Sequence, residues 1–177
     1  MTDKFEQISL KTGFMKHNGG VLFRQISENH YEFKSIITKN HLNSAGITHG
    51  GYLAALIDAG SGSAAHRSAE PSPCVTISLD LKFIGTSKVG DEIIGRVKIL
   101  KKTKTLVFLF CELKCNNNII ASANGIWKIL KSTYLKSFKN LNLILFSIYQ
   151  VLTCLVMISL ENLVSLLRDV KRGTIMS

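Results

Sequence analysis

The stretch that decides the fold of this chain spans residues 43–58 and reads NSAGITHGGYLAALID. Its second half opens the only clear helix pattern of the first 130 residues, which the sequence predicts over about residues 49–67. Apolar and small residues recur there with the i, i+3, i+4 spacing of an amphipathic helix, at Leu53, Leu56, Ile57, Gly60 and Ala64. The prolines in residues 70–73 then end the helix.

Strand-like segments surround this helix. Two precede it, at residues 21–26 and 31–38, and four follow it, at residues 74–84, 92–102, 105–115 and 119–130. A short helix is expected over residues 3–13 and a loop over residues 39–48. Short connections between consecutive strands favour an antiparallel meander. One long helix against a curled antiparallel sheet defines an α+β class, and dimerisation would extend the small core of such a sheet.

The composition allows a packed core, because 46% of the residues are hydrophobic and only 19% are charged. The formal charge of +10 favours a polyanionic partner, such as a nucleic acid, a membrane surface or a phosphate-bearing cofactor. A solvated basic surface explains the charge equally well. No basic-aromatic stripe or nucleic-acid motif is present, so no nucleic-acid partner is expected.

The four cysteines show no zinc-like pairing. Cys111 and Cys115 share one face of a predicted strand but lie about 13 Å apart, too far for a disulfide or a shared metal ion. Reduced thiols are therefore expected, as in a cytoplasmic protein. The N-terminal residues MTDKFEQ contain no apolar segment of a signal peptide.

Residues 131–177 form a tail of different composition. Within it, residues 141–160 carry no charge and are long enough to cross the hydrocarbon core of a bilayer, and basic residues flank them. Five polar residues inside this run weaken the membrane interpretation. A membrane contact, an apolar helix packed within an oligomer and an extension without function all stay open. The sequence thus predicts a domain over residues 1–130 and an apolar, basic-flanked tail over residues 131–177.

The helix entry, His49-Gly50-Gly51, is suited to contact a ligand. Glycines let a ligand approach the backbone closely, and the first N–H groups of a helix have no acceptor within it. The positive end of the helix dipole lies behind these groups, which suits a developing oxyanion. A glycine pair that only turns a loop into a helix is the alternative.

Asp58 lies in the middle of the predicted helix, where aspartate has a low propensity. Its neighbours at i±3 and i±4 are Ala54, Ala55, Ser61 and Gly62, so no cation of the same helix pairs with it. Small residues around a lone carboxylate leave room for a ligand or for a second helix. An exposed acid without a function is the alternative.

The spacing of Gly50 and Asp58 predicts where a site would lie. They are eight residues apart, or about 12 Å along a helix. Attack on a carbonyl needs the reacting atoms within about 3–3.5 Å, so the two residues of one chain cannot serve the same carbonyl. They can do so when two such helices pack antiparallel about a two-fold axis. The spacing therefore predicts sites between subunits, two per dimer.

Residues 43–58 resemble the helix-entry motif of the PaaI-like hotdog-fold acyl-CoA thioesterases. The stretches 75–84, VTISLDLKFI, and 89–92, VGDE, resemble the strand and turn that follow it in that family, and the similarity covers about residues 20–130. It implies a hotdog fold, with a curled antiparallel sheet wrapped around one long central helix. It also implies hydrolysis of acyl- or aryl-acyl-coenzyme A to free acid and coenzyme A without a cofactor, in a homodimer or homotetramer.

The resemblance also implies roles for single residues. Asp58 matches the catalytic carboxylate, as a general base or a nucleophile. Gly50 matches the residue whose backbone N–H polarises the thioester carbonyl. Asn43 matches a side chain that helps to hold water or the thioester, and His49 matches a residue that lines the same pocket. Thr76 falls where members carry a serine or threonine that can orient the water.

Binding of the coenzyme A portion is expected at a second set of residues: Gly51, Thr86, Ser87, Lys88, Lys101 and Lys102. Many relatives carry a proline in the stretch where this chain has Gly85-Thr86-Ser87. The lysines around the predicted hairpin turn at residues 98–104 would receive the coenzyme's phosphates, whereas a solvated turn is the alternative. A metal site from His41, His49 and Asp58 is not expected, because the zinc-like spacing is missing.

Two other functions stay open beside the thioester hydrolase. A hotdog dehydratase or hydratase would need a histidine placed to remove a carbon-bound proton, and His49 abuts the glycines without a matching second motif. A non-catalytic acyl-CoA-binding module would not need Asp58. The sequence therefore predicts a cytoplasmic acyl-CoA thioesterase, with membrane association through residues 141–160 as an addition left open.

Overall fold

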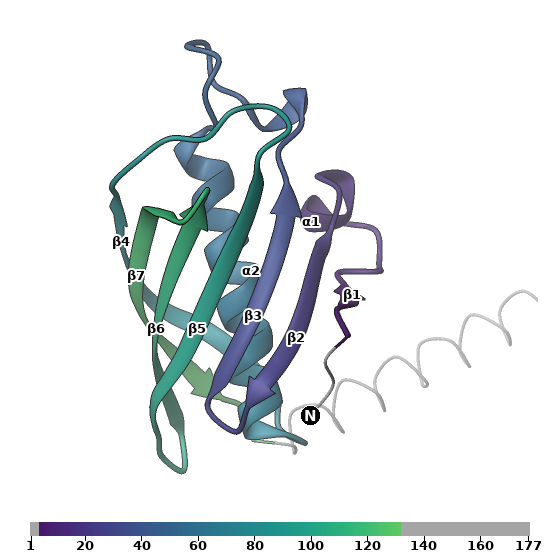
Figure 1. The fold of residues 1–177 in the computed structure, drawn as a ribbon. Helices are drawn as coiled ribbons and strands as arrows, with labels where there is room; N and C mark the ends of the chain where they lie inside the picture. The colour runs from purple at the N-terminus through teal and green to yellow at the C-terminus, as the bar shows by residue number, and fades with distance from the viewer. Residues whose placement is uncertain (1–3, 132–177) are drawn as a thin grey trace, which may run out of the picture. The chain divides into compact units, whose positions relative to one another are not determined.

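The computed structural model describes residues 4–131. Within them, seven strands form one antiparallel sheet that curls around the long helix α2 (Figure 1), which confirms the predicted α+β class. The elements in chain order are β1 (Glu6–Ile8), α1 (Phe14–His17), β2 (Val21–Ser27), β3 (His30–Ile36), the 3-10 turn η1 (Lys39–His41), α2 (Gly50–Ala69), β4 (Cys74–Phe83), β5 (Glu92–Lys102), β6 (Leu106–Cys115) and β7 (Asn118–Ile129).

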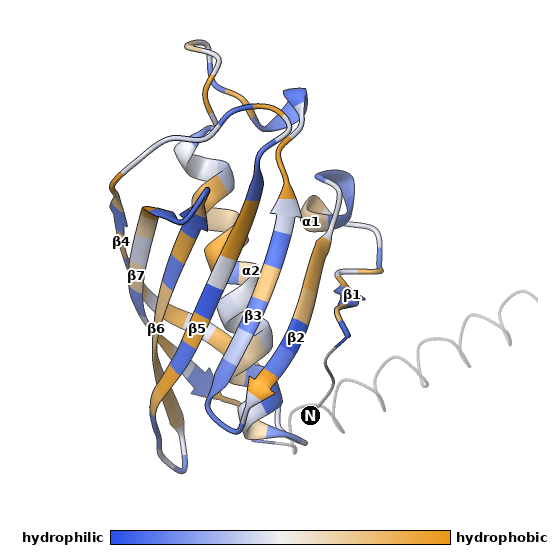
Figure 2. Ribbon diagram, in the orientation of Figure 1, coloured by the Kyte–Doolittle hydropathy of each residue, from blue (hydrophilic) through white to orange (hydrophobic). Residues whose placement is uncertain are grey.

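The sheet is amphipathic because side chains alternate between its two faces. Along β6 every second residue is buried against α2, and the residues between are half-exposed on the outer face. Figure 2 shows the same alternation as orange and blue bands along the strands. Cys111 and Cys115 are both free thiols on the buried face, as expected from their spacing. Burial raises the pKa of the Cys111 thiol to about 12, which keeps it protonated and unreactive.

Phe33 of β3 fixes the distance between α2 and the sheet. Its ring is fully buried between two glycines, Gly60 on α2 and Gly95 on β5. A Cβ atom would lie 2.3 Å from the ring at Gly60 and 2.1 Å from it at Gly95. Neither position can therefore accept a side chain unless the helix and the sheet move apart.

Two sequence predictions are wrong. No helix spans residues 3–13: residues 6–8 form β1, which pairs with β2, and α1 begins only at Phe14. Unpaired backbone groups on the edge of β2 attract this segment, and such tertiary pairing outweighs local helix propensity. The strands are also not a simple meander, because their order is β1-β2-β3-β5-β6-β7-β4. β4 pairs with β7, and the loop of residues 84–91 crosses the end of the sheet to reach β5 (Figure 1).

The remaining predicted elements agree with the structure to within two residues, and α2 begins at Gly50 and ends at Ala69. The tail beyond residue 131, including the predicted membrane contact at residues 141–160, lies outside the described residues. Within the described part, no helix combines the length and the apolarity that crossing a bilayer requires.

Candidate active site

Asp58 and Thr76 lie together on the open side of the helix. Asp58 projects from α2, and the Thr76 Oγ1 hydroxyl on β4 donates a hydrogen bond to Asp58 Oδ1 over 2.7 Å. Both residues are exposed. Asp58 Oδ2 has no partner among residues 4–131, so it can accept a proton from a water molecule.

Pairing between β4 and β7 brings Thr76 to this position. Thr76 lies opposite Trp127, on the face of the sheet that carries α2, and the register shifts between Thr76 and Ser78. Such an irregularity bends a strand locally and redirects its side chains. The hydroxyl that the resemblance assigned to Thr76 is therefore in contact with the carboxylate that it was expected to assist.

The helix entry presents one free backbone donor. His49 is the N-cap of α2, and its Nδ1 accepts the N–H of Gly51 over 2.8 Å. The N–H of Gly50 has no acceptor in the described part of the chain, and it lies at the positive end of the helix dipole. Gly50 thus keeps the donor that an oxyanion needs, whereas the donor of Gly51 is already used.

Asn43 shapes the loop before the helix. Its Oδ1 accepts the N–H of Ala45 over 2.9 Å and that of Ile47 over 3.3 Å, so the side-chain carbonyl closes a turn. Gly46 completes this turn with a φ of 76°. Only the amide nitrogen of Asn43 remains to contact water or a thioester.

The predicted coenzyme-binding residues fall into separate places. Ser87 is 4% exposed, and its hydroxyl donates to Thr48 Oγ1 over 2.7 Å, so it fastens two loops rather than facing a ligand. Thr86 and Lys88 are exposed beside it. The N–H of Lys88 donates to Asp91, which lowers the pKa of that carboxyl group.

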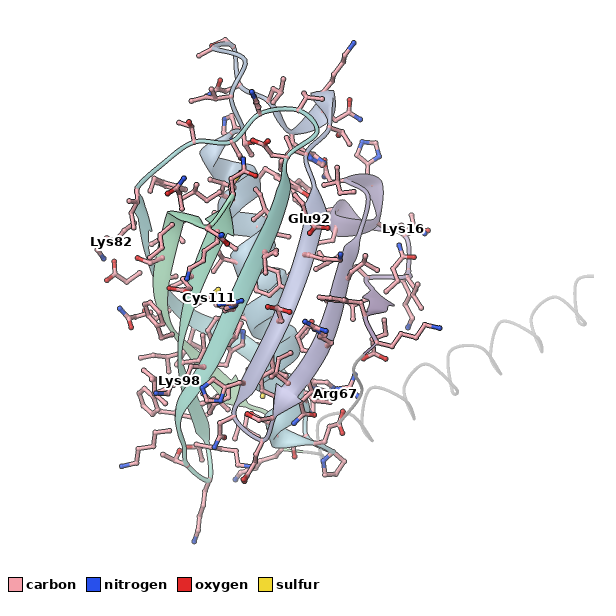
Figure 3. All side chains as sticks on the ribbon, in the orientation of Figure 1. Lys16, Arg67, Lys82, Glu92, Lys98 and Cys111 are labelled. Carbon is pink, nitrogen blue, oxygen red and sulfur yellow. The ribbon has the colours of Figure 1, made fainter. Side chains whose placement is uncertain are left out.

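Lys101 and Lys102 lie at the far end of β5 from this loop. Figure 3 shows Glu92 and Lys98 toward opposite ends of the strand, and its eleven residues extend over about 30 Å. Lys102 Nζ donates to the carbonyl of Ser68 over 2.6 Å, near the C-terminal end of α2. Within one chain, Lys88 and the pair Lys101 and Lys102 cannot contact the same phosphate group.

His41 is buried, and both of its ring nitrogens are hydrogen-bonded within the chain. Its ring is 3% exposed and stacks on Tyr52 with 3.7 Å between the ring centroids. Its Nδ1 accepts the N–H of Thr38 and its Nε2 donates to the carbonyl of Asn18. Burial lowers the pKa of His41. No cluster of three metal-ligating side chains occurs within residues 4–131.

Sequence reasoning missed two features of the site. The ring of Phe83, at the end of β4, lies against Gly50, since a Cβ atom on that glycine would be 3.3 Å from the ring. A groove of about 760 Å³ also runs along α2 and starts at Asp58 and Thr76. The signal for Phe83 was an aromatic residue near the end of the strand that resembles the family. The groove had no signal, because it depends on which strands form the edges of the sheet.

Comparison with known proteins places the chain in a family. Residues 45–121 match the model of the thioesterase superfamily. The Pseudomonas aeruginosa protein PA0474, which carries the provisional name of an esterase, is 35% identical over 94 residues, which are 52% of this chain and 70% of that protein. The acyl-coenzyme A thioesterase 13 of Mus musculus is 32% identical over 87 residues, 48% of this chain and 62% of that one. The chain belongs to the thioesterase superfamily.

Solved structures share the fold. Zebra fish thioesterase superfamily member 2 superposes with a TM-score of 0.63 and 23% identity, over 69% of this chain and 90% of that one. A Streptococcus pneumoniae thioesterase protein with coenzyme A gives 0.59 and 17%, over 63% and 87%. The E. coli PaaI protein gives 0.61 and 18%, over 66% and 83%. The fold is therefore the hotdog fold that the resemblance to the PaaI-like family implied.

Proposed function

We propose that this protein hydrolyses acyl-coenzyme A thioesters at sites formed between two copies of the chain. One observation carries the proposal: a hydroxyl-bound carboxylate, Asp58, and an unpaired helix-entry N–H, at Gly50, both lie where α2 packs beside β4. The name of the thioesterase 13 relative supports acyl-coenzyme A as the substrate. The coenzyme A in the S. pneumoniae structure supports binding of the coenzyme A portion of the substrate by the same fold.

Each reaction would use Asp58 and Thr76 of one copy and Gly50 of the other. The Gly50 N–H stabilises the oxyanion that develops on the thioester carbonyl. Asp58 Oδ2 takes a proton from water as the water oxygen attacks the carbonyl carbon, and Thr76 holds Oδ1. The carbon–sulfur bond breaks, the thiolate takes the proton that Asp58 received, and the products are a carboxylic acid and coenzyme A. Direct attack by Asp58, followed by hydrolysis of the anhydride, is the alternative route to the same products.

The free edge of the sheet supports assembly of two copies. β4 is the last strand on its side of the sheet within the described residues, so its outer backbone groups are unpaired there. Val75, Ile77 and Phe83 on this strand are all exposed. Pairing of β4 with β4 of a second copy would satisfy these backbone groups, cover Ile77 and Phe83 and bring the two α2 helices side by side.

The test is a panel of acyl-coenzyme A substrates with a free-thiol readout on the full chain. Hydrolysis releases one thiol for each thioester, whereas a dehydratase or hydratase changes the acyl chain and releases none. A binding module releases none and leaves the substrate unchanged. Thiol release that requires Asp58 supports the proposal, and its absence across the panel contradicts it.

A further inference from the structure

A groove begins at the candidate catalytic pair and follows α2 toward its C-terminal end. Its volume is about 760 Å³, within the range of small-molecule sites. One wall is the face of α2 that carries Gly62, Ser63 and His66, and the other is the beginning of β4. Asp58 and Thr76 form one end. A group attached to the reacting carbonyl could therefore continue directly into the groove.

The floor of the groove is apolar. It includes Trp127 and Phe23, each only 1% exposed, together with Ile8 and Val75. Gly62 packs closely on this tryptophan, because a Cβ atom there would lie 3.3 Å from Trp127 Nε1. An apolar group in the groove would contact this indole ring and lose water-exposed surface.

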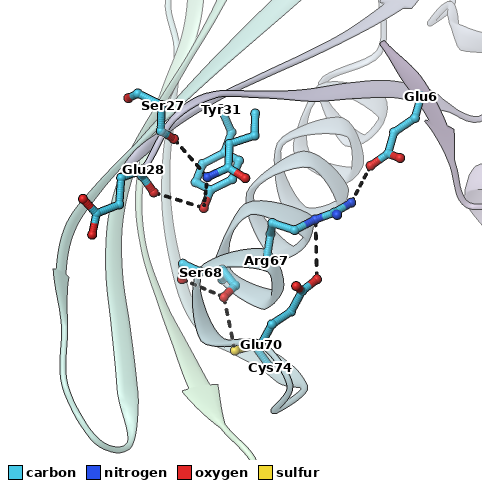
Figure 4. A network of polar contacts seen from close by, with 10 residues as sticks. Glu6, Ser27, Glu28, Tyr31, Arg67, Ser68, Glu70 and Cys74 are labelled. Atoms are coloured by element: carbon cyan, nitrogen blue, oxygen red, sulfur yellow. Dashed lines mark hydrogen bonds and ion pairs between the residues drawn. The ribbon is translucent and has the colours of Figure 1, made fainter. Parts of the chain in front are cut away.

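The charged side chains at the far end of the groove are already paired. Arg67 forms ion pairs with both Glu6 and Glu70, the latter at 3.6 Å (Figure 4). Lys102 lies at the same end, where its Nζ donates to the carbonyl of Ser68. Because both cations are engaged, a carboxylate at the end of a ligand would lose its water without gaining a free partner, so the site disfavours an acid-terminated chain.

In the proposed dimer the second α2 helix does not cover this half of the first. If Gly50 of one copy meets Asp58 of the other, the two-fold axis passes near Ala54, midway between them. The second helix then begins beside Asp58 and does not extend over Gly62 or His66. The second helix therefore leaves the groove open to a substrate.

We infer that the groove is the acyl subsite, and that the preferred substrates carry an unsubstituted medium-length acyl chain. This inference rests on the proposed thioesterase function. Asp58 and His66 are eight residues apart on α2, or about 12 Å. A saturated chain advances about 1.3 Å per carbon–carbon bond, so roughly nine carbons fill the groove. The coenzyme A portion of the substrate would extend from the carbonyl in the direction away from the groove.

The fluorescence of Trp127 can report binding of a ligand in the groove without any catalysis, since Trp127 is the one tryptophan of the chain. Its emission is titrated on the full chain with coenzyme A and with S-ethyl-, S-hexyl- and S-decyl-coenzyme A, thioethers that cannot be hydrolysed. The acyl assignment predicts an emission change that grows with alkyl length. An equal change with coenzyme A alone, or one independent of alkyl length, overturns it.

Chain-length preference gives the second test. Gly62→Leu fills the groove above Trp127, so the ratio of kcat/KM for decanoyl- over butyryl-coenzyme A should fall at least about tenfold. Ser63→Leu should act likewise and serves if Gly62→Leu does not fold, since the Ser63 hydroxyl bonds only to the helix carbonyl of Ala59. Asn124→Leu, exposed on the outer face of β7, is the matched control and should keep the wild-type ratio.

The charge at the far end is tested with glutaryl-coenzyme A, which should be a poorer substrate than pentanoyl-coenzyme A. Equal turnover of the two, or an unchanged length ratio in both leucine variants, overturns the subsite. Failure of the proposed function looks different. In that case no substrate releases thiol, while the alkyl-dependent emission of Trp127 still reports whether the groove binds acyl chains.

Discussion

Thr76 Oγ1 and Asp58 Oδ1 lie 2.7 Å apart although the two residues belong to different layers of the fold, the sheet and the helix. The hydrogen bond occupies one carboxylate oxygen and restricts rotation of the other. Two roles follow for the proposed reaction. Asp58 accepts the proton or attacks, and Thr76 orients the group that does so.

Asp58→Asn should leave the folded assembly intact and lower kcat by at least about a hundredfold, because an amide cannot act as a general base. The measurement is thiol release at saturating acyl-coenzyme A, with circular dichroism to check folding. Asp80→Asn is the control, since Asp80 is exposed on β4 and pairs only with Lys82. Near wild-type turnover of Asp58→Asn would remove Asp58 from the mechanism.

Thr76→Ala should lower kcat less, by about tenfold, because the hydroxyl orients a group and does not take the proton. Thr76→Ser keeps the hydroxyl and should recover most of the rate. The comparison uses the same thiol assay. If Thr76→Ala abolished activity while Asp58→Asn did not, the two roles would have to be exchanged.

Mixed dimers test the site between subunits. One chain carries Asp58→Asn and the other Gly50→Val, whose added atoms would meet the ring of Phe83 and crowd the carbonyl site. Each mutant homodimer should be inactive. In a mixed dimer one site inherits both defects and the other inherits none, so activity should recover to as much as half of the wild-type value. Verified mixed dimers without activity would mean that each site lies within one chain.

His41 should make the stability of the domain depend on pH. Burial lowers its pKa in the folded state, so the unfolded chain binds the proton first as the pH falls. The contribution of the neutral ring is complete above the unfolded pKa of about 6.5 and is lost progressively as the pH drops below it. Urea unfolding at a series of pH values should show this slope for the wild type and a smaller one for His41→Gln. His30→Gln, which changes an exposed histidine, is the control; an unchanged slope in His41→Gln would contradict the assignment.

Removal of residues 131–177 should leave thioesterase activity intact, because the candidate site and all the described strands precede residue 130. The expected change is in solubility or in partition to lipid vesicles, measured by sedimentation with the full chain alongside. An insoluble and inactive 1–130 protein would show that the tail is needed by the domain.

The sequence predicted the central helix and the residues at its two functional positions for identifiable reasons. Asp58 was conspicuous because a helix interior disfavours it, and Gly50 because paired glycines at a helix entry leave a donor free. The edge position of β4 could not be predicted, since local spacing carries no information on which strand of a sheet pairs with which. The same limit hid the groove, whose walls are α2 and that edge strand. His49 was assigned to the pocket by resemblance alone, and its role as the N-cap depends on a ring rotamer that only the structure shows.

The ring of Phe33, held between Gly60 and Gly95, acts as a spacer of fixed thickness between the two layers. Gly60 lies only two residues beyond Asp58 on the same helix, and Thr76 lies on the opposing sheet. The distance between Asp58 and Thr76 therefore depends on the thickness of the Phe33 ring, which is not part of the hydrogen bond between them. Replacing Phe33 with a larger or smaller side chain would change the distance from Asp58 to Thr76 while leaving every residue of the site unchanged.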